Sequence, residues 1–137
     1  MDTDNNKDMQ ADRKKTILVV DDEEAIRMLM VSLLGKDYEI ITKSDGQDAL
    51  DYLSKGNRPD LILLDMEMPN MNGRVFVRRV KFDPRYGKIP IFFVTSINNP
   101  LITNSFINMG VVDFVTKPFK PEELIAKVHD FFNVMHS

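Results

Sequence analysis

Residues 61–70 read LILLDMEMPN, and the first four of them are all apolar. An apolar run of this kind belongs in a protein interior, and its length suits a strand that is covered on both faces of a sheet. The run leads straight into the carboxylate of Asp65, although an isolated charge is costly to bury. The rest of the chain must therefore account for an aspartate at the end of the most apolar strand.

Four further strand-like runs alternate with helical patterns along the chain. The strand-like runs are Thr16–Val20, Tyr38–Thr42, Ile89–Thr95 and Val112–Thr116. The helical segments are Ile26–Leu34 before Gly35, a segment through Leu53 with Ser44 or Asp45 as its cap, Gly73–Lys81, a segment from Pro100 to Gly110, and Pro121–Met135. Five strands alternating with five helices predict an α/β protein with a five-stranded parallel sheet, doubly wound as (βα)5.

Polar residues follow four of these strands, and the carboxyl ends of parallel strands share one edge of the sheet. Ligands of open α/β sheets bind beyond that edge. The residues expected there are Asp21, Asp22, Asp65, Thr95, Ser96 and Lys117. Asp65 is then delivered to a shared edge and is not buried alone. One of the two aspartates after the first strand could also cap the helix that follows.

Three neighbouring carboxylates repel one another unless a cation joins them. An all-oxygen set of ligands with open positions suits Mg²⁺, which keeps several of its waters. A carboxylate is also a nucleophile towards phosphorus and forms an acyl phosphate. The ammonium of Lys117 and the hydroxyl of Thr95 can neutralise and hydrogen-bond phosphoryl oxygens.

The stretches ILVVDDEE, PDLILLDMEMPNMNG, FFVTS and FVTKPF together resemble the CheY-like receiver domain of two-component response regulators. The resemblance runs from residue 15 to about residue 135. Successive separations of 43, 30 and 22 residues between Asp22, Asp65, Thr95 and Lys117 agree with it. The resemblance implies the flavodoxin-like fold of that family.

The resemblance also implies a phosphoacceptor and a metal site. Asp65 would accept the phosphoryl group. Asp22 would bind Mg²⁺ directly and Asp21 mainly through water, together with Asp65 and the backbone carbonyl of Glu67. Glu67 and Ile97 match positions that tune dephosphorylation in the family.

The resemblance also assigns residues that bind the phosphoryl group and residues that change position when it is bound. The resemblance implies that Thr95 and Lys117 bind the phosphoryl group, and that Phe114 is the switch aromatic that swings inward with Thr95. It also implies a cis peptide bond between Lys117 and Pro118, since proline makes that geometry accessible.

These implications lead to a functional expectation. The chain would be a stand-alone response regulator that takes a phosphoryl group from the phosphohistidine of a sensor histidine kinase or phosphotransfer protein. It would catalyse its own phosphorylation and dephosphorylation and would not be a metabolic enzyme. Its fourth helix, fifth strand and fifth helix, roughly residues 100–135, would then signal to a downstream protein, as a monomer or as a phosphorylation-dependent dimer.

Three alternatives stay open at this point. The first is the receiver fragment of a longer regulator that has an output domain. The second is a haloacid-dehalogenase-like phosphohydrolase that forms an aspartyl phosphate and uses Glu67 as its acid/base. The third is a binding module that has lost phosphorylation.

Composition excludes several other classes of protein. A chain of 137 residues fits one domain, with a flexible polar tail over residues 1–14 and the receiver domain over 15–137. A net charge of −3 argues against generic nucleic-acid binding. There is neither a membrane-length apolar stretch nor the apolar core of a signal peptide, and the absence of cysteine excludes disulfides. A cytoplasmic protein is expected.

Overall fold

The computed structural model describes the backbone of residues 13–68 and 70–135. Most of the predicted polar tail, residues 1–12, lies outside the described residues. The elements in chain order are β1 (Thr16–Val20), α2 (Glu24–Leu34), β2 (Glu39–Lys43), α3 (Gly46–Ser54), β3 (Leu61–Asp65), α4 (Gly73–Phe82), β4 (Ile91–Thr95), α5 (Pro100–Thr103), α6 (Ser105–Asn108), β5 (Asp113–Thr116) and α7 (Pro121–Met135).

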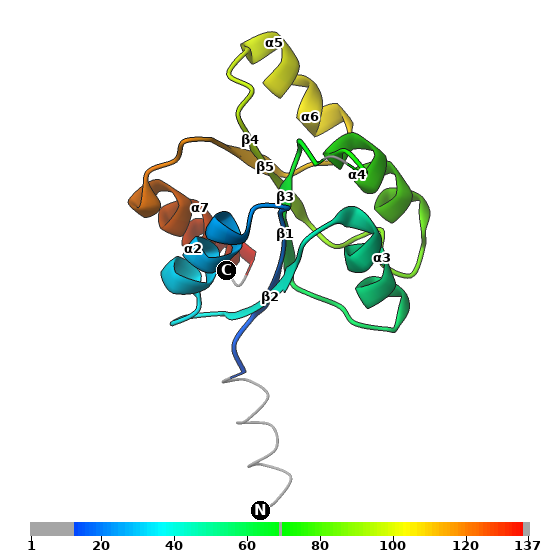
Figure 1. Cartoon of the computed structure of the whole chain (residues 1–137), viewed down its shortest axis with the longest axis horizontal. Coiled ribbons are helices and arrows are strands. Elements are labelled where there is room, and N and C mark those ends of the chain that lie inside the picture. The colour runs from blue at the N-terminus through cyan, green and yellow to red at the C-terminus, as the bar shows by residue number, and fades with distance from the viewer. Residues whose placement is uncertain (1–12, 69, 136–137) are drawn as a thin grey trace, which may run out of the picture.

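The five strands form one sheet in the order β2-β1-β3-β4-β5, and every neighbouring pair is parallel. This confirms the predicted doubly wound, flavodoxin-like fold (Figure 1). The register is set by the pairs Val20–Leu64, Asp65–Val94 and Thr95–Thr116. Because the strands run in the same direction, this register brings the residues that follow β1, β3, β4 and β5 to one edge.

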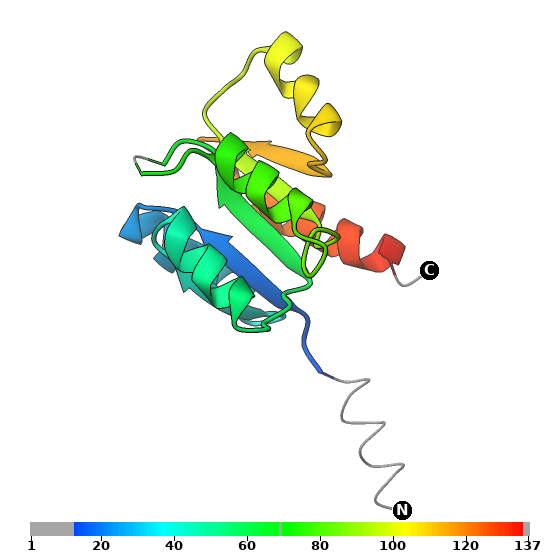
Figure 2. The ribbon, with the colours of Figure 1, turned by 90° about the vertical axis from the view of Figure 1, so that its right-hand side faces the viewer.

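Helices cover both faces of the sheet and enclose two separate apolar clusters. Helices α2 and α7 pack on one face, whereas α3 and α4 lie together on the other (Figures 1 and 2). Successive side chains of a strand point to opposite faces. In β3, Leu61 and Leu63 therefore join the cluster under α2 and α7, and Ile62 and Leu64 join the cluster under α3 and α4. This two-sided burial explains the uninterrupted apolar run that leads to Asp65.

The segment predicted as one helix from Pro100 to Gly110 forms two short helices, α5 and α6, which meet at Asn104. Hydroxyl groups compete with the backbone around this point, as they do in other helices. Thr103 Oγ1 donates to the carbonyl of Pro100, and Ser105 Oγ donates to the carbonyl of Ile102. The predicted single helix is therefore wrong in its continuity, although both pieces lie where it was expected.

Smaller differences concern where elements begin. β4 starts at Ile91 rather than Ile89, because Pro90 has no N–H to give to a ladder. Of the two caps considered for α3, Asp45 is the one observed, and its side chain accepts from the Asp48 N–H at 2.8 Å. Within residues 13–68 and 70–135, no helix has both the length and the apolar character that a membrane crossing requires.

Candidate functional site

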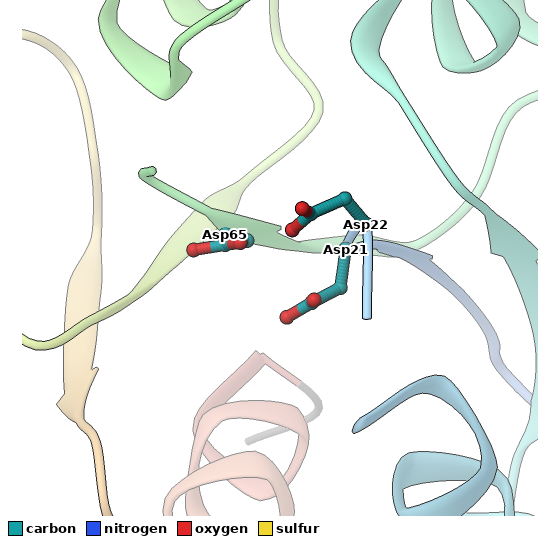
Figure 3. Close-up of side chains that lie close together, drawn as sticks. All are labelled: Asp21, Asp22 and Asp65. Carbon is teal, nitrogen blue, oxygen red and sulfur yellow. The ribbon is translucent and has the colours of Figure 1, made fainter. Parts of the chain in front are cut away.

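Three carboxylates meet at the carboxyl edge of the sheet, as the sequence predicts. Asp21 and Asp65 are almost completely buried, with 2% and 3% of their surface exposed, and Asp22 is exposed beside them. One oxygen from each carboxylate lies within 4.8 Å of the other two (Figure 3). A donor set made only of carboxylate oxygens is suited to a hard divalent cation.

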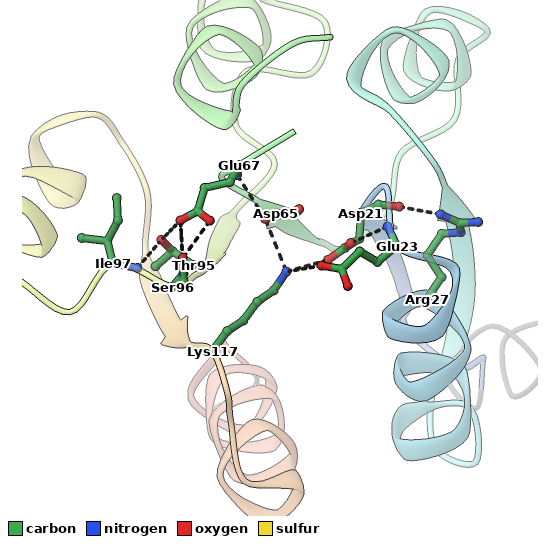
Figure 4. A network of polar contacts seen from close by, with 9 residues as sticks. All are labelled: Asp21, Glu23, Arg27, Asp65, Glu67, Thr95, Ser96, Ile97 and Lys117. Carbon is green, nitrogen blue, oxygen red and sulfur yellow. Dashed lines mark hydrogen bonds and ion pairs between the residues drawn. The ribbon is translucent and has the colours of Figure 1, made fainter. Parts of the chain in front are cut away.

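The loop after β1 is held by hydrogen bonds to Asp21. The Asp21 side chain accepts from the Glu23 N–H at 2.9 Å, and the Asp21 carbonyl accepts from Arg27 Nη1 at 2.8 Å (Figure 4). Neither aspartate is the cap of α2, because the N-cap position is Glu23, which makes no side-chain capping bond. The pair of aspartates thus faces the sheet edge.

Lys117 places an ammonium group among these acids. Its Nζ lies 3.2 Å from Asp21 Oδ2, 3.5 Å from Asp65 Oδ1 and 3.9 Å from Glu23 Oε1 (Figure 4). Burial alone would lower the pKa of Lys117, but Asp21 and Asp65 outweigh burial and raise it. The peptide bond from Lys117 to Pro118 is cis, as the resemblance implies. Glu23 was not expected at this site.

Asp65 has an unusual proton affinity. Burial raises the pKa of Asp65 to about 6. The Glu67 N–H, which donates to Asp65 Oδ1 at 3.1 Å, and the charge of Lys117 oppose this rise, whereas Asp21 and Asp22 add to it. The sheet edge therefore holds more negative charge than its lysine balances.

This raised pKa makes stability depend on pH. A carboxyl group that binds its proton more tightly in the folded state stabilises the fold at low pH, and that stabilisation is lost as the pH rises through about 6. In metal-free buffer, raising the pH from 5 to 7 should therefore increase the free energy of unfolding of Asp65→Asn by about 1 kcal/mol relative to that of wild type. Urea unfolding of both proteins at the two pH values measures the change, and an equal difference at both would contradict the expectation.

Thr95 lies at the end of β4 and is fully buried. Its Oγ1 donates to Glu67 Oε1 at 3.3 Å and accepts from the Ile97 N–H at 3.0 Å. Ser96 Oγ lies 2.8 Å from Oε1 and 2.7 Å from Oε2 of the same carboxylate (Figure 4). The sequence interpretation assigned a ligand role to the Glu67 carbonyl and missed this use of its side chain. The register of β3 with β4, once known, indicates that residues 67 and 96 lie close together.

Gly73 brings the loop after β3 back over the sheet. A Cβ at this position would lie 2.8 Å from Met66 Cα and 2.9 Å from Phe93 Cε1, which is closer than real Cβ atoms approach. The Gly73 N–H donates to the Met66 carbonyl at 2.8 Å. Glycine at this position therefore holds the segment that carries Glu67 against the edge where Asp65 stands.

Phe114 is partly buried in β5 and packs against the cluster under α3 and α4. Its ring meets the ring of Phe106 edge-on, with centroids 5.7 Å apart. Lys127 Nζ lies 5.3 Å from the centre of the Phe114 ring and donates to the Phe114 carbonyl at 2.8 Å. The ring thus contacts both an inner aromatic side chain and a cation on α7.

The fold and this acidic edge define an open α/β protein with a cluster of three carboxylates, which could hold a metal ion, at the carboxyl ends of its strands. The sequence model of the response regulator receiver domain matches residues 17–129. The chain belongs to this family, the receiver domains of two-component signalling. Membership favours the receiver interpretation over the phosphohydrolase alternative.

Known relatives share the same region of the chain. The response regulator PleD of Caulobacter vibrioides is 39% identical over 113 residues, which cover 82% of this chain and 25% of that protein. The cyclic di-GMP phosphodiesterase response regulator RpfG of Xanthomonas campestris is 34% identical over 121 residues, covering 86% and 32%. The chain spans less than half the length of the curated relatives compared.

One solved structure matches this chain along nearly the whole length of the solved chain. The chemotaxis response regulator CheY4 of Vibrio cholerae superposes with a TM-score of 0.78 at 31% sequence identity. The match covers 85% of this chain and 98% of that chain.

Proposed function

We propose that this receiver domain accepts a phosphoryl group on Asp65 from the phosphohistidine of a sensor histidine kinase or phosphotransfer protein. The observation that carries the proposal is the position of Asp65. It ends β3 beside two further carboxylates, and its Oδ1 lies 3.5 Å from Lys117 Nζ. A nucleophile, a cation site and a fixed ammonium group are the parts that phosphoryl transfer to a carboxylate requires.

The carboxylates fit Mg²⁺ as a cofactor, because they supply only hard oxygen ligands within 4.8 Å of one another. Asp21, Asp22, Asp65 and the backbone carbonyl of Glu67 would hold the ion. When bound, Mg²⁺ would offset the charge of the carboxylates and of the phosphoryl oxygens.

In the transfer step, a carboxylate oxygen of Asp65 attacks phosphorus. The new P–O bond forms as the P–N bond to the donor histidine breaks, and the electron pair of that bond stays on the histidine nitrogen, which takes up a proton. Lys117 offsets the charge on the phosphoryl oxygens, and the Thr95 hydroxyl donates a hydrogen bond to one of them. Attack of water on phosphorus later releases inorganic phosphate and restores the Asp65 carboxylate.

Signalling would follow from a shift between two conformations of the same chain. Thr95 and Phe114 would move together, and the surface of α5, α6, β5 and α7 would pass the change to a downstream protein. Large apolar side chains already stand exposed on this surface, namely Leu101, Ile107 and Val112. The same surface is available for a phosphorylation-dependent dimer. We infer a cytoplasmic location from the partners that this function requires.

The direct test is the intact mass of the chain after incubation with acetyl phosphate, with and without Mg²⁺. One phosphoryl adduct that forms only with Mg²⁺ is expected. If neither acetyl phosphate nor a phosphorylated histidine phosphotransfer domain labels the folded protein, the proposed function is wrong.

Asp22→Ala should weaken Mg²⁺ binding by about tenfold or more, because the variant loses a ligand and a negative charge. Isothermal titration calorimetry with Mg²⁺ measures the affinity directly. Asp48→Ala, which removes an exposed acid in the first turn of α3, makes the same change in net charge away from the site and should bind Mg²⁺ as wild type does. Equal affinities in all three proteins would argue that Asp22 is not a ligand.

A further inference from the structure

We propose that Glu67 and Ser96 form a clasp that holds the hydroxyl of Thr95 in the unphosphorylated protein, and that this clasp competes with the phosphoryl group for that hydroxyl. The clasp consists of the Glu67 carboxylate, the side chain and N–H of Ser96, and the Thr95 hydroxyl. This inference rests on the proposed function, because it concerns how Asp65 phosphorylation is balanced.

The clasp is a dense set of hydrogen bonds between two loops. Glu67 Oε1 accepts from Thr95 Oγ1 at 3.3 Å, from Ser96 N at 3.3 Å and from Ser96 Oγ at 2.8 Å. Oε2 lies 2.7 Å from the same Ser96 oxygen. Hydrogen bonds to an ionised carboxylate are stronger than those between neutral groups. The loop after β3 is thereby joined to the loop after β4.

The Thr95 hydroxyl can serve only one acceptor at a time. A threonine hydroxyl has a single proton to donate, and in this structure that proton is directed to Glu67. The lone pairs of the same oxygen accept from the Ile97 N–H. A phosphoryl oxygen on Asp65 therefore gains the Thr95 proton only if Glu67 gives it up.

The charges favour release of the clasp once Asp65 is phosphorylated. Glu67 lies two residues from Asp65, and its own N–H donates to Asp65 Oδ1. Lys117 makes ion pairs with Asp21, Glu23 and Asp65, and no ion pair to Glu67 occurs among the described residues. A phosphoryl group placed next to an acidic side chain repels it. Phosphorylation thus draws the Thr95 hydrogen bond away from Glu67 and adds like charge beside the Glu67 carboxylate.

Within the clasp, the Glu67 carboxylate acts as an internal anionic ligand of Thr95. The clasp thereby stabilises the unphosphorylated conformation. A ligand that must displace it binds more weakly than it would to a protein already open. Weakening the clasp should therefore tighten the binding of any phosphoryl group or phosphoryl analogue at Asp65.

The test uses beryllofluoride with Mg²⁺ as the phosphoryl analogue. Ser96→Ala removes the donor closest to the Glu67 carboxylate and leaves every charge in place. We expect it to bind beryllofluoride about threefold to tenfold more tightly than wild type, as the loss of a competing hydrogen bond implies. Ser54→Ala is the matched control, since it removes an exposed hydroxyl that bonds a backbone carbonyl at the end of α3, and its affinity should equal that of wild type.

A second pair of variants shows whether the tighter beryllofluoride binding of Ser96→Ala depends on the Glu67 side chain. In a Glu67→Ala background the clasp is absent, so adding Ser96→Ala should leave the affinity unchanged. The amide NMR signal of Ile97, whose N–H contacts Thr95, should move in free Glu67→Gln towards its position in analogue-bound wild type.

The possible results separate the clasp from the proposed function. If Ser96→Ala binds beryllofluoride no more tightly than wild type does, the clasp is overturned. The clasp is also overturned if adding Ser96→Ala to Glu67→Ala tightens beryllofluoride binding as much as it does in wild type. Wild type that binds no beryllofluoride in the presence of Mg²⁺ overturns the proposed phosphoryl site itself, and the clasp with it.

Discussion

Replacing Asp65 with asparagine is expected to abolish phosphoryl uptake and to leave the protein folded. The amide of asparagine matches the carboxylate in shape, and its oxygen can still accept from the Glu67 N–H. It lacks the nucleophilic charge that forms an acyl phosphate. Because Asp65 is 3% exposed and lies against Asp21, removing its charge also relieves repulsion. Intact mass after incubation with acetyl phosphate and Mg²⁺ should show no adduct.

A matched variant shows that the loss is specific. Asp60 stands just before β3, at the opposite end of that strand, where its side chain accepts from the Thr16 N–H at 2.8 Å. Asp60→Asn should be labelled as wild type is. If Asp65→Asn were labelled to the same extent, the acceptor would be another residue and the assignment of Asp65 would be wrong.

Lys117→Met is expected to slow phosphorylation by about 100-fold to 1000-fold, the usual loss when a fixed electrostatic group is removed from a transition state. Among residues 13–68 and 70–134, Lys117 alone makes an ion pair with Asp65. Methionine keeps most of the length of the side chain without its charge. The rate of adduct formation from acetyl phosphate, followed by intact mass over time, measures the effect.

Metal affinity distinguishes this effect from general damage to the site. Lys117 and Mg²⁺ both neutralise the same carboxylates. Removing the charge of Lys117 should therefore leave Mg²⁺ affinity unchanged or raise it. Lys120→Met, an exposed lysine three residues further on, should behave as wild type in both measurements. A normal phosphorylation rate in Lys117→Met would show that the ammonium group does not act in the transfer.

The sequence predicts the sheet edge well because strand ends determine it. Continuous apolar runs identify β1, β3 and β4, and parallel strands bring their last residues together. The positions of Asp21, Asp22, Asp65 and Lys117 follow from that geometry alone. The spacing of residues was sufficient because each of them lies within two residues of a strand end.

Other features depend on contacts that periodicity does not contain. The clasp joins side chains from two loops, and its existence depends on the rotamers of Glu67 and Ser96 and on the close approach at Gly73. The division of one expected helix at Asn104 coincides with hydroxyl bonds from Thr103 and Ser105 to nearby carbonyls. Neither feature changes the apolar pattern, so the sequence pattern could not reveal them.

The distribution of the site over four strand ends has a consequence for folding. Asp21 and Lys117 are 96 residues apart in sequence, and the strands that carry them are separated in the sheet by β3 and β4. Non-local pairings of this kind are slow to form, because loop-closure entropy must be overcome before their contacts stabilise the chain. A partly folded intermediate that lacks any one of these strands has an incomplete site. Recovery of phosphoryl uptake during refolding, which in the proposed function needs residues from β1, β3, β4 and β5, should therefore follow the pairing of all four strands.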